Sequence, residues 1–219
     1  MKKIFEFLSE SELFMSMDAE QIKSLLPYLN ARELEFDKGS LILSEGEAAG
    51  NAGIILSGSV YITSEDYYGN RSITAETGPG EMFAEVFASA GVSHMPVSVF
   101  AAENSRILLL DLRAVTGGSL SPIPGAETLA VNLLRIVSRK TLLLNRKIHI
   151  LSRRTTREKI LAYLSYHAQI SKSSCFDIPF DRQELADFLC VDRSAMSAEL
   201  SRMKKDGLIK YHKNHFRLL

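Results

Sequence analysis

The sequence predicts an α+β protein with a mainly β domain, a long helix and a small winged helical domain, in that order. Three observations support this fold class. Short apolar stretches alternate with turn residues over 32–112, a long helical apolar pattern covers 126–151, and a helix-turn-helix pattern with a terminal hairpin follows. We therefore divide the chain into residues 1–125, 126–151 and 152–219.

The composition is that of a globular protein without a disulfide framework. Of the 219 residues, 46% are hydrophobic, which is enough to build buried cores. The chain contains no apolar run near the roughly 20 residues that a membrane-spanning helix needs, and its first residues lack a signal-peptide pattern. The two cysteines, Cys175 and Cys190, lack zinc-site spacing. These features predict a cytoplasmic protein without a metal site.

The net charge is zero, but charge is unevenly distributed along the chain. Residues 1–125 carry 8 Lys and Arg against 17 Asp and Glu, whereas the counts are 5 against 1 in 126–151 and 13 against 8 in 152–219. An acidic first half followed by a basic remainder is typical of a sensor joined to a module that binds a polyanion.

The segment 32–112 has the pattern of an antiparallel sandwich or barrel. Glycines such as Gly46 and Gly58 separate its apolar stretches, as expected for many short strands joined by tight turns. Before these strands, residues 9–29 predict one or two short helices. The strand-like stretches are 41–43, 53–56, 59–63 and 106–110.

Residues 126–151 predict one long helix with two neighbouring apolar stripes. One stripe would dock the helix on its own domain, and the second indicates packing against another copy of the chain. An ordinary buried helix has the same periodicity and stays an alternative. The residues expected at the dimer helix are Leu129, Ala130, Leu133, Leu134, Val137, Leu144, Ile148 and Leu151.

The next segments predict three shorter helices. Thr155 and Glu158 have the spacing of a capping box. Residues 181–207 then form a helix-turn-helix pattern, with the turn near Cys190, which we expect to be buried. Asp192 is expected to cap the second helix of the pair and Gly207 to end it. The inward face of this second helix is predicted to be Ala195, Met196, Leu200 and Met203.

A terminal hairpin and the outward face of the second helix predict DNA recognition. Residues 208–211 and 216–218 are expected to form the hairpin, or wing, while the helix enters a major groove. The residues expected to read bases are Arg193, Ser194, Ser197, Ala198 and Arg202. The residues expected to contact phosphates are Arg182, Gln183, Lys204, Lys210 and Lys213. For a dimer, the predicted partner is double-stranded DNA with an inverted-repeat operator.

The whole chain resembles the CRP/FNR family of bacterial transcription regulators. The resemblance implies an N-terminal antiparallel β-roll of the cyclic-nucleotide-binding type, a central dimerisation helix and a C-terminal winged helix-turn-helix. It also implies that an effector bound in the roll repositions the DNA-reading helices, and it makes RNA polymerase a candidate partner. The motifs that carry the resemblance are Gly46-Glu47, Gly58-Ser59-Val60, Gly80-Glu81-Met82-Phe83-Ala84-Glu85 and Arg182-Gln183-Glu184-Leu185-Ala186.

The expected effector pocket departs from that of relatives that bind cyclic AMP. Those relatives have a Gly-Glu pair and then an Arg-Ser pair, where this chain has Ala84-Glu85 and Met95-Pro96. Methionine cannot neutralise a phosphate and proline has no backbone donor, so tight cyclic AMP binding is not expected. An apolar or aromatic effector fits these positions, and so does plain barrel core, which is slightly favoured. The pocket residues are Met82, Phe83, Ala84, Glu85, Phe87, Met95, Pro96 and Val97.

Other cofactors and activities have little support in the sequence. An iron–sulfur cluster is not expected, because residues 1–174 contain no cysteine. Haem is a minor candidate with His94 as its ligand, although a lone loop histidine is more often a surface residue. His212 and His215 are expected to be exposed in the wing turn or to lie near a phosphate, and not to form a metal site. The sequence shows no catalytic triad, paired carboxylates or phosphate loop, so an enzyme is not predicted. A module whose winged helix docks a protein is the last alternative, against which the basic helix face argues.

Overall fold

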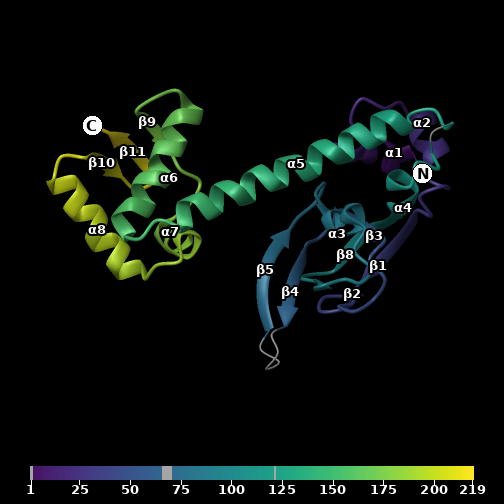
Figure 1. The fold of residues 1–219 in the computed structure, drawn as a ribbon, viewed down its shortest axis with the longest axis horizontal. Helices are drawn as coiled ribbons and strands as arrows, with labels where there is room; N and C mark the ends of the chain where they lie inside the picture. Colours follow the sequence, from purple (N-terminus) through teal and green to yellow (C-terminus); the bar gives the residue numbers. More distant parts are fainter. Residues whose placement is uncertain (1, 66–70, 121) are drawn as a thin grey trace. The chain divides into compact units, whose positions relative to one another are not determined.

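The computed structural model describes residues 2–65, 71–120 and 122–219 (Figure 1). The chain divides into two compact units, Met1–Arg139 and Lys140–Leu219. The long helix α5 (Ala126–Leu151) has the bounds that the sequence predicts, and it contributes residues to both units. The division therefore falls within this helix. Among the described residues, no helix combines the length and the apolar character needed to cross a membrane.

The first unit begins with three short helical segments, α1 (Lys2–Glu10), the 3-10 helix η1 (Glu12–Phe14) and α2 (Ala19–Leu25). The sequence predicts one or two short helices over 9–29, and α1 starts earlier than that range. A capping box fixes the start of α2, because the Asp18 side chain accepts from the Gln21 amide at 2.8 Å and the Gln21 side chain accepts from the Asp18 amide at 3.0 Å.

Two four-stranded antiparallel sheets form the body of the first unit, and they confirm the predicted antiparallel β fold. The first has the order β1-β8-β3-β6, and the second has the order β2-β7-β4-β5. Their strands are β1 (Arg32–Phe36), β2 (Leu41–Leu43), β3 (Asn51–Ser57), β4 (Val60–Glu65), β5 (Arg71–Thr77), β6 (Met82–Phe83), β7 (Ser98–Ala101) and β8 (Ser105–Asp111). The described part of the unit also contains the short helices α3 (Glu85–Ala90) and α4 (Arg113–Thr116).

The first unit has two hydrophobic cores. One joins the sheet that contains β3 and β8 to the helices, and the other includes Ile55, Val60 and Val99. The second core depends on Gly53, since a Cβ there would lie 2.1 Å from the Phe83 ring. The Phe83 side chain therefore packs directly on the backbone of β3.

The two apolar stripes of α5 have different surroundings. Leu129 and Leu133, which the sequence analysis places on the dimer face, are buried at 0% and 4% exposure in the helical core of their own unit, so that placement is wrong for these two residues. Leu134, Leu144 and Ile148 are instead 66%, 59% and 55% exposed. Of the other predicted dimer-helix residues, Ala130 is exposed, and Val137 and Leu151 are half-buried.

The second unit is a winged helix-turn-helix, as predicted. After the end of α5, its helices are α6 (Thr156–Ser171), α7 (Arg182–Leu189) and α8 (Arg193–Lys205). The hairpin of β10 (Ile209–His212) and β11 (His215–Leu218) forms the wing. A third strand, β9 (Cys175–Asp177), pairs with β11. No sequence pattern predicts β9, because three residues are too few for a strand pattern.

Local signals define the ends of these helices. The Thr155–Glu158 capping box is present, and Asp192 caps α8 by accepting from the Ala195 amide at 2.8 Å. Gly207 follows the last turn of α8 with φ 73°. Two expectations are wrong. Ala195 is exposed because it lies in the first turn of α8, and Cys190 is exposed because the left-handed turn after α7 turns it outward.

Candidate functional site

The turn between α7 and α8 is held by side-chain caps and one backbone contact. The Asp181 carboxylate accepts from the amides of Gln183 and Glu184 at 2.7 and 2.9 Å, which fixes the start of α7. The Val191 amide donates to the Ala186 carbonyl at 3.0 Å and closes the turn. Hydrogen bonds, above all one from Ser194, lower the pKa of Asp192. The carboxylate at the start of α8 therefore stays ionised where the helix dipole favours it.

Helix α8 has one packed side and one open side. Met196, Leu200 and Met203 are 0–1% exposed and belong to the core of the second unit. The predicted base-reading residues lie on the open side, where Arg193, Ser194, Ala198 and Arg202 are exposed and Ser197 is half-buried. The structure thus brings the five together on one face. Two of them have partners within the protein, since Ser194 donates to Asp192 at 2.5 Å and Arg202 donates to Glu199 at 3.0 Å.

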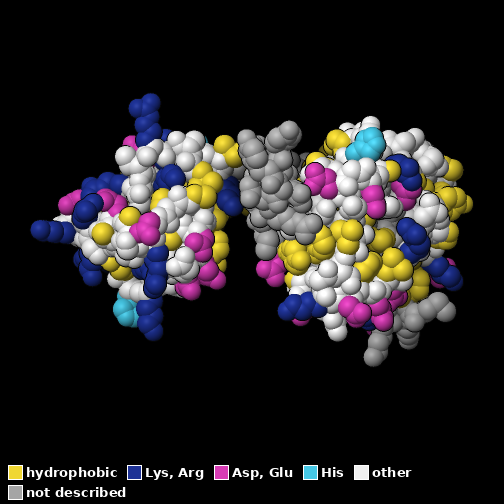
Figure 2. All heavy atoms as spheres, turned by 90° about the horizontal axis from the view of Figure 1, so that it is seen from below, with side chains coloured by type: hydrophobic (Ala, Val, Ile, Leu, Met, Phe, Trp, Pro, Cys, Tyr) yellow, Lys and Arg dark blue, Asp and Glu magenta, His cyan; other side chains and the backbone are white. Residues whose placement is uncertain are grey.

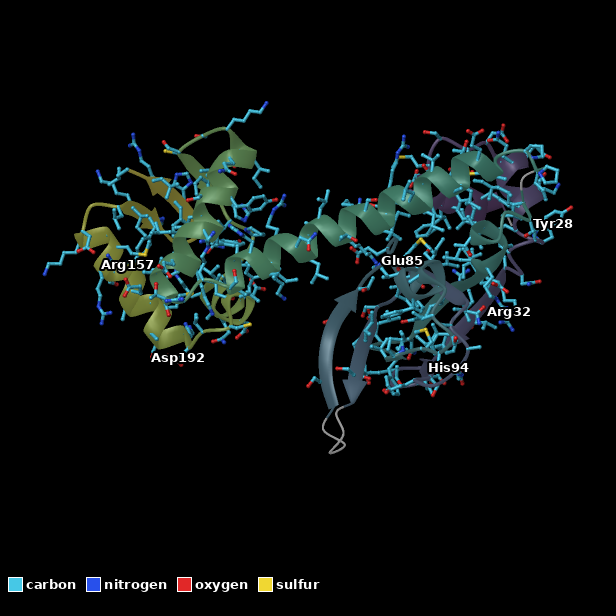
Figure 3. The ribbon with its side chains drawn as sticks, viewed as in Figure 1. Tyr28, Arg32, Glu85, His94, Arg157 and Asp192 are labelled. Carbon is cyan, nitrogen blue, oxygen red and sulfur yellow. The ribbon has the colours of Figure 1, made fainter. Side chains whose placement is uncertain are left out.

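An ion-pair network that the sequence analysis missed holds α8 against α6. The Arg157 Nε lies 2.5 Å from Glu199 Oε1, and another nitrogen of the same guanidinium lies 2.8 Å from Asp206. The hydrogen bond from Arg157 is the main cause that lowers the pKa of Glu199. Figure 3 shows Arg157 and Asp192 in the second unit. Arg157 and Glu199 lie 42 positions apart, so no local pattern reveals their contact.

Arg182 joins the start of α7 to the wing. Its guanidinium donates to the Lys213 carbonyl at 2.8 Å, and the guanidinium carbon lies 5.1 and 5.2 Å from the ring centroids of Tyr211 and Phe216. Burial lowers the pKa of this half-buried guanidinium. The wing thus already engages the Arg182 side chain, which the sequence assigns to a phosphate contact.

The other predicted phosphate contacts, Gln183, Lys204, Lys210 and Lys213, are exposed. Lys204 lies beside the wing, with its Nζ 5.3 Å from the Tyr211 ring centroid. Figure 2 shows Lys and Arg side chains projecting from the second unit, with Asp and Glu among them. The side chains of Lys204, Lys210 and Lys213 are thus open to solvent on α8 and the wing.

The predicted effector-pocket residues are mostly core residues of the first unit. Phe83, Ala84 and Met95 are 1–5% exposed and belong to one core, while Met82 belongs to the other. Glu85 is also buried, as the first residue of α3, and Ala84 before it has φ 61°. Phe87 and Val97 are half-buried and Pro96 is exposed. This arrangement agrees with the barrel-core interpretation of the sequence.

The backbone of Met95 is hydrogen-bonded to the turn at Gly46 and Glu47, which follows β2. Its amide donates to the Glu47 carbonyl at 2.8 Å, and its carbonyl accepts from the Gly46 amide at 2.9 Å. These bonds turn the thioether inward, where relatives that bind cyclic AMP place a cation according to the resemblance. The neighbouring His94 is exposed (Figure 3). In the wing, His212 is exposed and His215 Nδ1 lies 3.0 Å from Asp177 Oδ1.

Comparisons with known proteins identify both units. Residues 33–117 match the family described as cyclic nucleotide-binding domain, and residues 158–219 match the Crp-like helix-turn-helix domain. The chain therefore belongs to the CRP/FNR family of transcription regulators, as its sequence motifs imply. Its fold is that of a DNA-binding regulator with a cyclic-nucleotide-binding-like sensor.

Individual relatives agree with this assignment. A relative from Rhizobium leguminosarum bv. viciae, described as "Probable transcriptional activator", is 38% identical over 65 residues, which span 27% of each protein. The catabolite activator protein of Thermus thermophilus has the same fold, with a TM-score of 0.54, 21% identity and coverage of 95% of this chain and 94% of that one. DNR from Pseudomonas aeruginosa also gives a TM-score of 0.54 at 21% identity, over 100% of this chain and 95% of that one.

Proposed function

We propose that this chain is a sequence-specific DNA-binding transcription regulator that acts as a homodimer. The observation that carries the proposal is α8, whose packed side is anchored by apolar residues and whose open side presents Arg193, Ser194 and Arg202 to solvent. A helix held in this way can enter a major groove with its N-terminal turn toward the base edges. Membership of a regulator family supports the same function.

The residues divide into base-reading and phosphate-contacting sets. In this proposal Arg193, the first residue of α8, donates two hydrogen bonds to a guanine. Exposed cations of α8 and the wing neutralise phosphates and set affinity without setting sequence. Arg182 acts on this surface indirectly, because it holds the wing against α7.

Substituting Arg193 tests the assignment of the reading helix. Arg193→Ala should weaken binding to the operator, once it has been identified by selection from random duplex DNA, by roughly 10- to 100-fold, which is the contribution of one bidentate base contact. Binding to random DNA should change little. Binding can be measured by fluorescence anisotropy at fixed salt. Lys205→Ala, at the other end of α8, is the matched control. It should weaken binding to the operator and binding to random DNA slightly and to the same extent. Unchanged operator binding in Arg193→Ala would rule out this orientation of α8.

The operator of the homodimer should be an inverted repeat. Two copies paired along α5 would present their reading helices to major grooves about one helical turn apart, roughly 10 bp. Selection from random duplex DNA by the purified protein, followed by sequencing, should recover such a repeat. Recovery of a single, unrepeated site would contradict dimeric reading of DNA.

We also propose that the sensor does not respond to cyclic AMP. The buried thioether of Met95 supports this, since it supplies no charge for a phosphate at the position concerned. Loss of one charge-assisted contact at such a site costs roughly a hundredfold in affinity. Calorimetric titration with cyclic AMP should therefore give no saturable heat at micromolar concentrations, and saturable micromolar binding would contradict the proposal.

A further inference from the structure

The second unit contains a pocket that lies apart from the DNA-reading face. Its volume is about 380 Å³, within the range of small-molecule sites. The last turns of α5, the middle of α6 and the segment that leads into α7 enclose it, and Ile150 forms part of its apolar wall. Among the described residues that line it, none is a predicted base or phosphate contact.

Aromatic side chains form much of the pocket wall. The Tyr163 ring centroid lies 4.6 Å from that of His167, 5.3 Å from that of Phe188 and 6.1 Å from that of Phe180. All four side chains line the pocket. A wall of this kind favours a flat aromatic ligand, because offset and edge-to-face ring contacts add to the gain from burying apolar area.

Tyr163 also supplies a polar group that the folded chain leaves unused. The residue is 3% exposed, and its hydroxyl has no hydrogen-bond partner among the described residues. Burial raises its pKa, so the hydroxyl stays neutral and able to donate. A buried hydroxyl without a partner destabilises a fold, because the group loses its hydrogen bonds to water and gains none in return. A ligand with an acceptor atom would remove this cost when it binds.

The charges around the pocket are positive. Arg146 and Lys147 line it, and Lys147 Nζ lies 5.4 Å from the Phe188 ring centroid. Burial and the nearby Arg146 lower the pKa of His167, which is therefore neutral at pH 7. None of the described lining residues carries a carboxylate. The pocket thus favours an anion over a neutral or cationic ligand.

We propose that this pocket binds a small planar aromatic acid. The rings of Tyr163, Phe180 and Phe188 enclose the aromatic part, the Tyr163 hydroxyl donates to an oxygen of the ligand, and Lys147 faces the acidic group. The site belongs to the DNA-binding unit and is separate from the β-roll, where the family resemblance places an effector. Its existence does not depend on the proposed reading of DNA.

The first experiment uses 2-naphthoate as the probe and the full-length protein. The chain contains no tryptophan, so the fluorescence of a naphthyl ring is measured with little protein background. We expect saturable binding of one 2-naphthoate per chain and weaker binding of the neutral 2-naphthamide, which has nearly the same shape. Absence of saturable binding, or one probe per two chains, would overturn the proposal.

Two variants separate the site from a general affinity for apolar surface. Tyr163→Phe should weaken 2-naphthoate binding by roughly 2- to 10-fold, the value of one neutral hydrogen bond, yet raise the melting temperature because the unused hydroxyl is gone. Lys147→Met should weaken 2-naphthoate binding and leave 2-naphthamide binding unchanged. Tyr61→Phe in the first unit and Lys210→Met in the wing are the matched controls, and neither should change the affinity. Equal effects of a variant and its control would overturn the assignment.

Discussion

The guanidinium of Arg157 contacts both Glu199 and Asp206, and it thereby links α6 to α8 and to the residue that ends α8. Because the hydrogen bond from Arg157 lowers the pKa of Glu199, this carboxylate stabilises the folded state above its unfolded pKa. The stabilisation is lost as the pH falls through the lower, folded pKa. The ion pair between Arg157 and Glu199 thus makes the stability of the second unit sensitive to acid.

Removing Arg157 should reduce this dependence on pH. The free energy of unfolding should fall as the pH is lowered from about 7 to about 3, and it should fall less in Arg157→Met than in the unchanged protein. Urea denaturation followed by circular dichroism at each pH measures this slope. Arg202→Met removes the weaker partner of Glu199 and should keep most of the slope. Identical slopes in all three proteins would show that Arg157 does not control the carboxylate.

At the scale of elements, the turn between α7 and α8 contains a strained backbone position. Cys190 ends α7 with φ 51° and ψ 54°, a left-handed conformation that costs a residue with a side chain about 1–2 kcal/mol. The side chain is exposed, so little packing would be lost on its removal. Glycine adopts this conformation without strain, although it loses more backbone entropy on folding.

Cys190→Gly should therefore stabilise the helix pair. We expect the free energy of unfolding to rise by about 0.5–1 kcal/mol, since relief of strain exceeds the entropy cost of glycine. Thermal and urea denaturation measure the change. Cys190→Ala removes the thiol and keeps the Cβ, so it should leave stability nearly unchanged. An equal gain from both substitutions would assign the effect to the thiol and not to the backbone.

At the scale of the whole molecule, the exposed stripe of α5 argues for a second copy of the chain. Leu134, Leu144 and Ile148 are each more than half exposed, and a pocket lined by Val86, Ala90 and Leu134 lies beside the first of them. Clustered apolar surface at heptad spacing along a helix is typical of an interface with another helix. The proposed dimer would also place two reading helices on one DNA duplex.

Leu134→Glu should disrupt this dimer. A carboxylate repeated across a two-fold axis would be desolvated next to its own copy, so the dimer dissociation constant should rise by at least roughly 100-fold. Sedimentation equilibrium measures the change. Leu142→Glu is the matched control, because Leu142 is also a leucine of α5, 64% exposed, but lies off the stripe. Dissociation of both variants, or of neither, would place the interface elsewhere.

The order of the elements and many of their ends follow from the sequence alone. The caps at Thr155 and Asp192 and the glycine at 207 act within a few residues, so their effect is readable from local spacing. The periodicity of α5 likewise predicts one helix with two apolar stripes, and the position of Met95 predicts a sensor without a phosphate-binding cation. These signals are short-range, or they depend on residue type alone.

The tertiary structure decided what depends on contacts between distant residues. Both stripes of α5 have the same period, and only packing against the helical core shows that Leu129 and Leu133 are buried in their own unit. An arginine such as Arg182 is a residue type that often contacts phosphate, yet its guanidinium donates to the carbonyl of Lys213 in the wing, 31 positions away. The Tyr163 pocket also joins three segments of the chain. Local sequence specifies elements because caps and periodicity act over one or two turns, whereas neighbours in space are chosen by the packing of the whole unit.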